Sequence, residues 1–113
     1  PEAVEGVETR TYDPPTATEF ETLSISIEEA FRFEKEDALV FRIRLTNKTE
    51  APIRYRPGSL SLRVGNRLYP QSITDASGMV EKTELVYFAI IGSPDGRELS
   101  LKNDFAVALE FVP

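Results

Sequence analysis

The chain has 113 residues and a net charge of −6, with 41% hydrophobic and 28% charged residues. These proportions fit one globular domain and exclude a collagenous, disulfide-dense or wholly disordered chain. Because the sequence has no histidine and no cysteine, it cannot supply a Ser-His-Asp triad, a thiol nucleophile, a redox pair or an ordinary zinc site. No run approaches the roughly 18 apolar residues of a membrane-spanning helix.

The charge is unevenly distributed along the chain. Residues 39–69 carry seven basic residues against Glu50 alone, whereas residues 1–38 and 70–113 are acidic. A uniformly acidic protein would repel polyanions. This distribution instead predicts a local basic face.

The first 22 residues differ from the rest of the chain. They are acidic, rich in threonine and proline, and without sustained periodicity, and Pro14-Pro15 excludes a helix there. We predict a linker or loosely held arm over residues 1–22 and one β-domain over residues 23–113. Since the first residue is Pro1, we also expect the chain to be part of a longer protein.

Apolar and polar side chains alternate from residue 23 onward, which predicts strands. Residues 23–33 form the first strand, with a bulge or kink at Glu29-Ala30. A helix over residues 27–37 is the competing prediction, because glutamate, alanine and lysine favour helices. After a charged turn at residues 34–37, the clearest strand is residues 39–46, whose large apolar side chains share one face.

Turn signals divide the remainder of the chain. We predict a polar turn over residues 47–52, a strand end at Pro57-Gly58, a two-residue hairpin turn at Gly65-Asn66 and a long loop over residues 70–83. The remaining strands are predicted at residues 53–56, 60–64, 67–69, 85–91, 99–101 and 105–111.

This pattern of seven to eight short strands without a long helix predicts an all-β fold. We expect an antiparallel immunoglobulin-like β-sandwich, with a small barrel as the alternative architecture. The chain has no cysteine and no tryptophan, so the Cys-Trp-Cys core of antibody domains is excluded.

The segment from Leu39 to Gly78 has a recognisable order. A strand ending in a polar turn (LVFRIRLTNKTEAPI) precedes a hairpin (SLSLRVGNRLYP) and a loop closing in DASG. This layout resembles the immunoglobulin-like domains of bacterial envelope proteins, namely the telokin-like domains of secreted lipoproteins and similar modules of conjugative-transfer proteins. In those families an Asn-x-Thr or Asn-x-Ser step often follows the strand, as Asn47-Lys48-Thr49 does here. The resemblance implies an extracytoplasmic (periplasmic, cell-surface or secreted) adhesion, scaffold or assembly module without catalytic residues.

Five arginines at alternating strand positions form the first candidate site: Arg42, Arg44, Arg54, Arg56 and Arg63. If their strands pair consecutively, these side chains project from one sheet face. Guanidinium groups bind carboxylates, sulfates and phosphates bidentately, so an acidic glycan or another polyanion is the candidate ligand. The competing interpretation is that nearby acids neutralise the patch by cross-strand ion pairing. The candidate acids are Glu28, Glu34, Glu36 and Glu110.

The second candidate site is the apolar run LVYFAII at residues 85–91. Because residues of both parities are apolar, we expect this strand to be covered on both sides or to lie at a contact. Val86, Phe88 and Ile90 are the candidate protein-contact residues, and pairing with another chain is one form of such a contact. The competing interpretation buries one face in the sandwich and the other beneath the acidic arm.

Other chemistry has little support in the sequence. Asp75, Asp95 and Asp104 are candidate calcium ligands, but they lack EF-hand spacing and lie where turns favour aspartate. We predict no metal and no cofactor. Tyr55 and Tyr69 could stack nucleic-acid bases but suit the core equally well, and we predict no nucleic-acid partner.

These observations predict a noncatalytic immunoglobulin-like module for protein contact or assembly in a bacterial envelope or secreted protein. Its expected partner is another protein or another domain of the same chain, and no membrane span is expected within this segment. The alternative function is binding of a carbohydrate or polyanion through the arginine-rich face. An enzyme is the least favoured class, since nothing singles out a catalytic pair among the 19 acidic residues.

Overall fold

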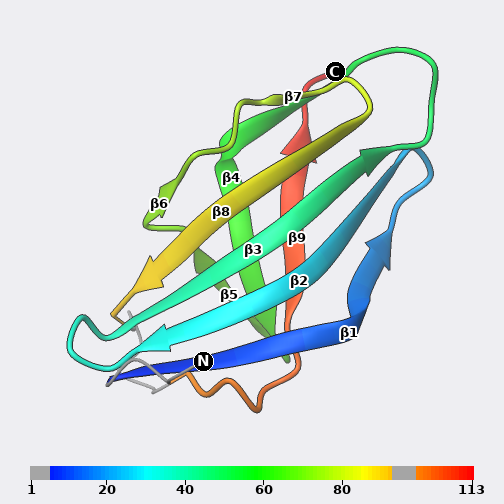
Figure 1. Ribbon diagram of the computed structural model, residues 1–113. Coiled ribbons are helices and arrows are strands. Elements are labelled where there is room, and N and C mark those ends of the chain that lie inside the picture. Colours follow the sequence, from blue (N-terminus) through cyan, green and yellow to red (C-terminus); the bar gives the residue numbers. More distant parts are fainter. Residues whose placement is uncertain (1–5, 93–98) are drawn as a thin grey trace.

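The computed structural model describes residues 6–92 and 99–113, which form an antiparallel β-sandwich (Figure 1). This confirms the predicted all-β class. The strands of the described residues are β1 (Val7–Glu19), β2 (Leu23–Phe33), β3 (Ala38–Asn47), β4 (Ile53–Val64), β5 (Arg67–Pro70), β6 (Ile73–Thr74), β7 (Met79–Val80), β8 (Thr83–Ile91) and β9 (Ala106–Phe111).

The strands form two facing sheets. The first is five-stranded, in the order β1-β2-β3-β8-β6. In the second, β4 is central, with β9 along one side and the short strands β5 and β7 along the other. In Figure 1 the five-stranded sheet crosses obliquely in front of β4 and β9.

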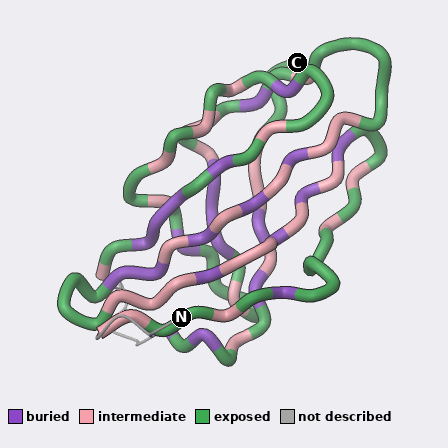
Figure 2. Tube along the Cα trace, viewed as in Figure 1, coloured by how far each residue is buried: buried purple, intermediate pink, exposed green. Residues whose placement is uncertain are grey.

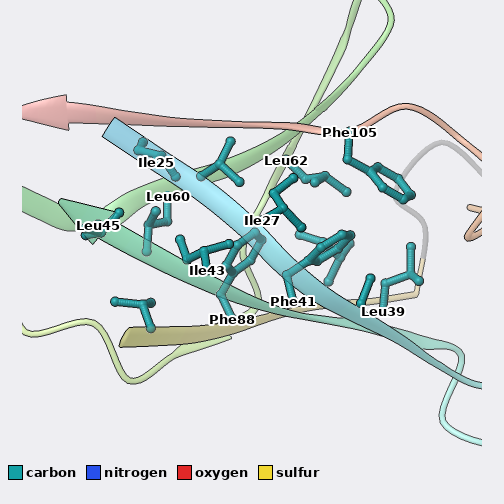
Figure 3. Packing of buried hydrophobic residues seen from close by; sticks show 14 of the residues in the cluster. Ile25, Ile27, Leu39, Phe41, Ile43, Leu45, Leu60, Leu62, Phe88 and Phe105 are labelled. Carbon is teal, nitrogen blue, oxygen red and sulfur yellow. The ribbon is translucent and has the colours of Figure 1, made fainter. Parts of the chain in front are cut away.

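The core lies between the sheets and is built from alternate strand residues, as Figure 2 shows along β2 and β3. The ring of Phe41 stacks on that of Phe88, with centroids 5.2 Å apart, and meets Phe105 edge-on at 5.0 Å (Figure 3). Burying such rings contributes much of the free energy of folding. The predicted inner face of β3 is confirmed, because its four large apolar residues are buried: Leu39, Phe41, Ile43 and Leu45.

Several local predictions are confirmed. Residues 34–37 form a turn, and Gly65 has the positive φ of 60° that a two-residue hairpin turn requires. The bulge in β2 is present, but it lies just before the predicted Glu29-Ala30, as a register shift between Ile27 and Glu29. The competing helix over residues 27–37 is wrong, because residues 27–33 pair with β3.

The arm predicted over residues 1–22 is corrected where the structure describes it. Val7–Glu19 is β1, the outer strand of the five-stranded sheet, and it pairs with β2 with a register shift between Thr11 and Thr16. The Pro14-Pro15 pair lies within that shift, where the missing N–H groups remove no hydrogen bond between the strands. The strand escaped detection because an edge strand with both faces largely exposed has no apolar alternation.

Three further segments differ from prediction: β4, residues 99–101 and the loop over residues 70–83. β4 passes through Pro57-Gly58 and continues to Val64, while its pairing with β9 is interrupted between Arg56 and Ser61. A bulge at this point tolerates the proline. Residues 99–101 form no strand, although both of their leucines are buried. The loop predicted over residues 70–83 includes the two-residue strands β6 and β7.

Candidate functional site

The two faces of β8 have different environments. Val86, Phe88 and Ile90 point into the core and are at most 2% exposed. A partner of the folded domain cannot reach them, which corrects their assignment as contact residues. These three side chains are part of the core that packs the first sheet against the second.

The opposite face of β8 is open to solvent, so the alternative in which both faces are covered is wrong. Leu85, Tyr87 and Ile91 are all exposed there. The strand pairing continues this apolar surface onto the neighbouring strands. Ala89 lies opposite Val40 of β3 on one side and Ile73 of β6 on the other.

Two paired rows of residues define what we call the apolar patch on the outer face of the five-stranded sheet. One row is Val7, Phe33, Ala38 and Ile91, and the other is Phe31, Val40, Ala89 and Ile73. Between β3 and β6 the patch is hollowed into a shallow groove of about 400 Å³. The alternation of apolar residues within a single strand does not predict this patch, because its residues come from five strands.

The five candidate arginines do not share one face. Arg42 and Arg44 of β3 lie on the outer face of the five-stranded sheet, opposite Tyr87 and Leu85 of β8. The other three lie on β4, in the second sheet. The predicted single arginine face is therefore wrong, because β3 and β4 belong to different sheets.

The bulge in β2 places two consecutive glutamates beside the arginines of β3. Glu28 Oε1 and Oε2 lie 3.3 Å from Arg42 Nε and 2.9 Å from Arg44 Nε, and Glu29 Oε1 lies 3.1 Å from Arg42 Nη1. A hydrogen bond with Tyr87, followed by the charges of these two glutamates, raises the pKa of Arg42. The predicted neutralisation by Glu28 is therefore confirmed for Arg42 and Arg44. We call these two arginines, together with Glu28 and Glu29, the ion-paired cluster.

The arginines of β4 are less constrained. Arg54, Arg56 and Arg63 are exposed on the outer face of the second sheet. Arg56 lies 3.9 Å from Glu110, and Arg63 donates to the carbonyl of Gly65 at 3.3 Å. Within the described residues, Arg54 and Arg63 form no ion pair.

A hydrogen bond between two side chains joins the sheets near one end of the sandwich. Tyr55 of β4 is buried and its hydroxyl donates to Glu84 Oε1 of β8 at 2.6 Å. Glu84 Oε2 in turn accepts the backbone N–H of Ser77 at 2.9 Å. Burial, and then the hydrogen bond to Glu84, raise the pKa of Tyr55. Sequence reasoning missed this pair, since the two residues are 29 positions apart.

Most of the other residues that the sequence singled out make hydrogen bonds within the fold or are buried in the core. Asn47 organises its turn: its side-chain oxygen accepts the backbone N–H of Thr49, and its side-chain nitrogen donates to the carbonyl of Ala51 in the same turn and to those of residues 80 and 81. Asp75 accepts the N–H of Tyr87 at 2.8 Å. Asp95 lies outside the described residues. Tyr55 and Tyr69 are both buried, so neither presents a ring to bases.

The part of the chain that the structure describes holds no cluster of metal ligands. No three acidic, histidine or cysteine side chains gather there as a metal site, and no helix in that part has the length and hydropathy to cross a membrane. No protein-family model, curated protein or solved structure matches this chain. A functional assignment therefore depends on the geometry of the domain itself.

Proposed function

We propose that this domain is a noncatalytic protein-contact or assembly module and that the apolar patch is its contact surface. The observation that carries the proposal is the continuous set of apolar side chains on one sheet face, in which two isoleucines are largely exposed while Ala38 and Ala89 are buried. Ile73 is 63% exposed and Ile91 is 56% exposed. Contiguous exposed apolar surface of this kind is typical of sites where another protein packs.

The surroundings of the patch support this proposal. Along β3 and β8 the patch ends at the ion-paired cluster, so apolar residues are bordered by charged ones. An apolar centre with a polar rim is the usual arrangement of a protein interface. The half-buried rings of Phe31 and Phe33 add aromatic area, which is enriched in such interfaces.

The finer identity of the module belongs to the same proposal. The strand layout of residues 39–78 and the two-sheet architecture support an immunoglobulin-like domain of a bacterial envelope or secreted protein. Such a module would act outside the cytoplasm, with another protein or another domain of the same chain as its partner.

Site-specific photo-crosslinking tests the contact surface. A photoreactive residue is placed at Ile91 in the full-length protein, in cells that produce it. We expect a discrete adduct with one protein, or with another domain of the chain, and loss of that adduct when Ile73→Lys is added. Because Ile73 is exposed, Ile73→Lys should leave the melting temperature unchanged.

The matched control places the photoreactive residue at Arg63, on the outer face of the second sheet. No adduct is expected there. Equal adduct yields from the two positions, or no adduct from Ile91, would overturn the proposal.

A second candidate function, binding of an acidic glycan or another polyanion, rests on Arg54, Arg56 and Arg63, which share the outer face of β4. This function predicts retention on a heparin column at low salt. Retention should be lost in an Arg54→Ala/Arg63→Ala variant and kept in Arg42→Ala, whose arginine is ion-paired. A wild-type protein that passes through unretained excludes this function for heparin-like ligands.

A further inference from the structure

The edges of the two sheets are protected unequally. An edge strand presents unpaired backbone N–H and C=O groups, and proteins block such edges with proline, lysine, bulges, short strands or covering loops. The β1 edge has Pro14-Pro15 and a register shift. Beside β4, strands β5 and β7 have only four and two residues.

The β8 edge is covered by the chain segment that includes β6. Tyr87 N donates to Asp75 Oδ1 at 2.8 Å, and Ile91 N donates to Ser72 Oγ at 2.9 Å. These side chains take the positions that carbonyls of a further strand would occupy. The edge is therefore closed to a second chain.

The ring of Phe20 meets that of Phe111 edge-on at 5.9 Å, but within the described residues no strand covers the β9 edge. Its six residues, AVALEF, include no proline and no lysine, and the register shift with β4 lies on the β4 side. Glu110 N donates to Ser59 Oγ, and Val112 N donates to Arg54 O. The even-numbered residues of this strand therefore direct their backbone groups toward β4.

Antiparallel alternation then directs the backbone groups of the odd-numbered residues away from β4. These residues are Val107, Leu109 and Phe111. Within the described residues, β4 is the strand that pairs with β9, and no strand pairs with it on the opposite side. β9 thus offers a regular row of backbone donors and acceptors along its outer edge.

We propose that β9 is an interface for a second copy of this chain, which pairs with it through its own β9 in antiparallel orientation. A two-fold axis at Leu109 pairs Leu109 with itself and Val107 with Phe111 of the second copy. Each of these residues then exchanges both backbone hydrogen bonds. This surface lies on the other sheet from the apolar patch, so the dimer is independent of the proposed function.

The side chains are compatible with this register. On the outer face, Glu110 of each copy lies opposite Ala108 of the other, so no like charges meet. On the inner face Phe111, which is 37% exposed, comes beside Val107 of the second copy. Because the paired segment is short, the interface is at the small end of the size range. The dimer is therefore expected to be weak and to appear at high protein concentration.

A pair of charge variants at one position tests the register. Ala108→Lys places a lysine opposite Glu110 twice in the dimer and should strengthen association roughly 2- to 30-fold, and Ala108→Glu should weaken it by a similar factor. Dimerisation is measured by sedimentation equilibrium into the millimolar range. Within one copy Ala108 lies opposite the uncharged Ser61 of β4, and Arg63 is its diagonal neighbour.

Engineered cysteines test the geometry directly, since the chain has none of its own. An equimolar mixture of Ala108→Cys and Glu110→Cys proteins should form mainly the mixed disulfide, because these positions face each other as a closely spaced pair. A mixture of Ala108→Cys with Ala106→Cys is the control and should react less. A monomer at millimolar concentration, the same association change in both charge variants, or equal disulfide yields in the two mixtures would overturn the proposal.

Discussion

The inner and outer faces of β8 carry the same kinds of side chain in opposite environments. Ile90 is 2% exposed in the core, whereas the next residue, Ile91, is 56% exposed on the outer face of the sheet. The difference arises from position alone, because only one parity of β8 faces the second sheet. An apolar run in a strand therefore does not establish burial on both faces.

The polar groups on the two faces also differ in how far they are buried. The inner parity of β8 includes one carboxylate, Glu84, which is satisfied by the hydroxyl of buried Tyr55. The outer face instead has the half-exposed ion-paired cluster. A buried hydrogen bond is costly to break, whereas an exposed ion pair contributes little. Equivalent substitutions on the two faces should therefore have unequal effects on stability.

Truncating the two adjacent isoleucines should separate the faces most clearly. Ile90→Ala leaves a cavity in the core and should lower the free energy of unfolding by about 2–5 kcal/mol. Ile91→Ala removes mostly exposed area and should cost no more than about 1 kcal/mol. Urea denaturation followed by circular dichroism measures both. Equal losses would show that the outer face of β8 is also packed.

Removing the hydroxyl of Tyr55 should have an intermediate effect. Tyr55→Phe leaves Glu84 Oε1 without its donor and should cost about 1–3 kcal/mol. Tyr87→Phe removes the hydroxyl that hydrogen-bonds Arg42 on the exposed face and is the comparison; it should cost less, no more than about 1 kcal/mol, because water can replace that bond. The same denaturation measurement applies. If the two substitutions cost the same, the hydrogen bond between the sheets contributes no more than a surface contact.

The raised pKa of Tyr55 also predicts a pH dependence. A group whose pKa is raised by folding stabilises the fold fully below its unfolded pKa, and this contribution is lost as the pH rises further. The free energy of unfolding should therefore fall above about pH 10. Burial also raises the pKa of Tyr12, which adds to this fall. The fall should be smaller in Tyr55→Phe, and an identical pH profile in that variant would contradict the assignment.

The smallest effect is expected for the ion-paired cluster. Glu28→Gln removes the acid shared by Arg42 and Arg44 and should cost about 0.5–1 kcal/mol at low salt, and less at about 1 M salt because the pair is partly exposed. Glu110→Gln, whose partner is 3.9 Å away and exposed, should change stability by only a few tenths of a kcal/mol. Melting temperatures at two ionic strengths compare them. A loss for Glu28→Gln that salt does not reduce would contradict this assignment.

The sequence alone predicted the all-β class, most strands and most turns, because these depend on local properties. The alternation along residues 39–45 and the turn at Gly65-Asn66 are decided by neighbouring residues and by backbone sterics. Both appear in the structure as expected. The edge strand β1 was missed, since solvent on both of its faces removes the apolar period that reveals a strand.

The candidate sites depended on tertiary structure instead. Whether five arginines share one face depends on which sheet each strand joins, and the sequence does not encode strand order locally. Whether the even or odd residues of β8 are buried depends on the position of the second sheet, and both parities are equally apolar. Local sequence therefore determined what each segment becomes, while packing between distant segments determined which side chains meet water.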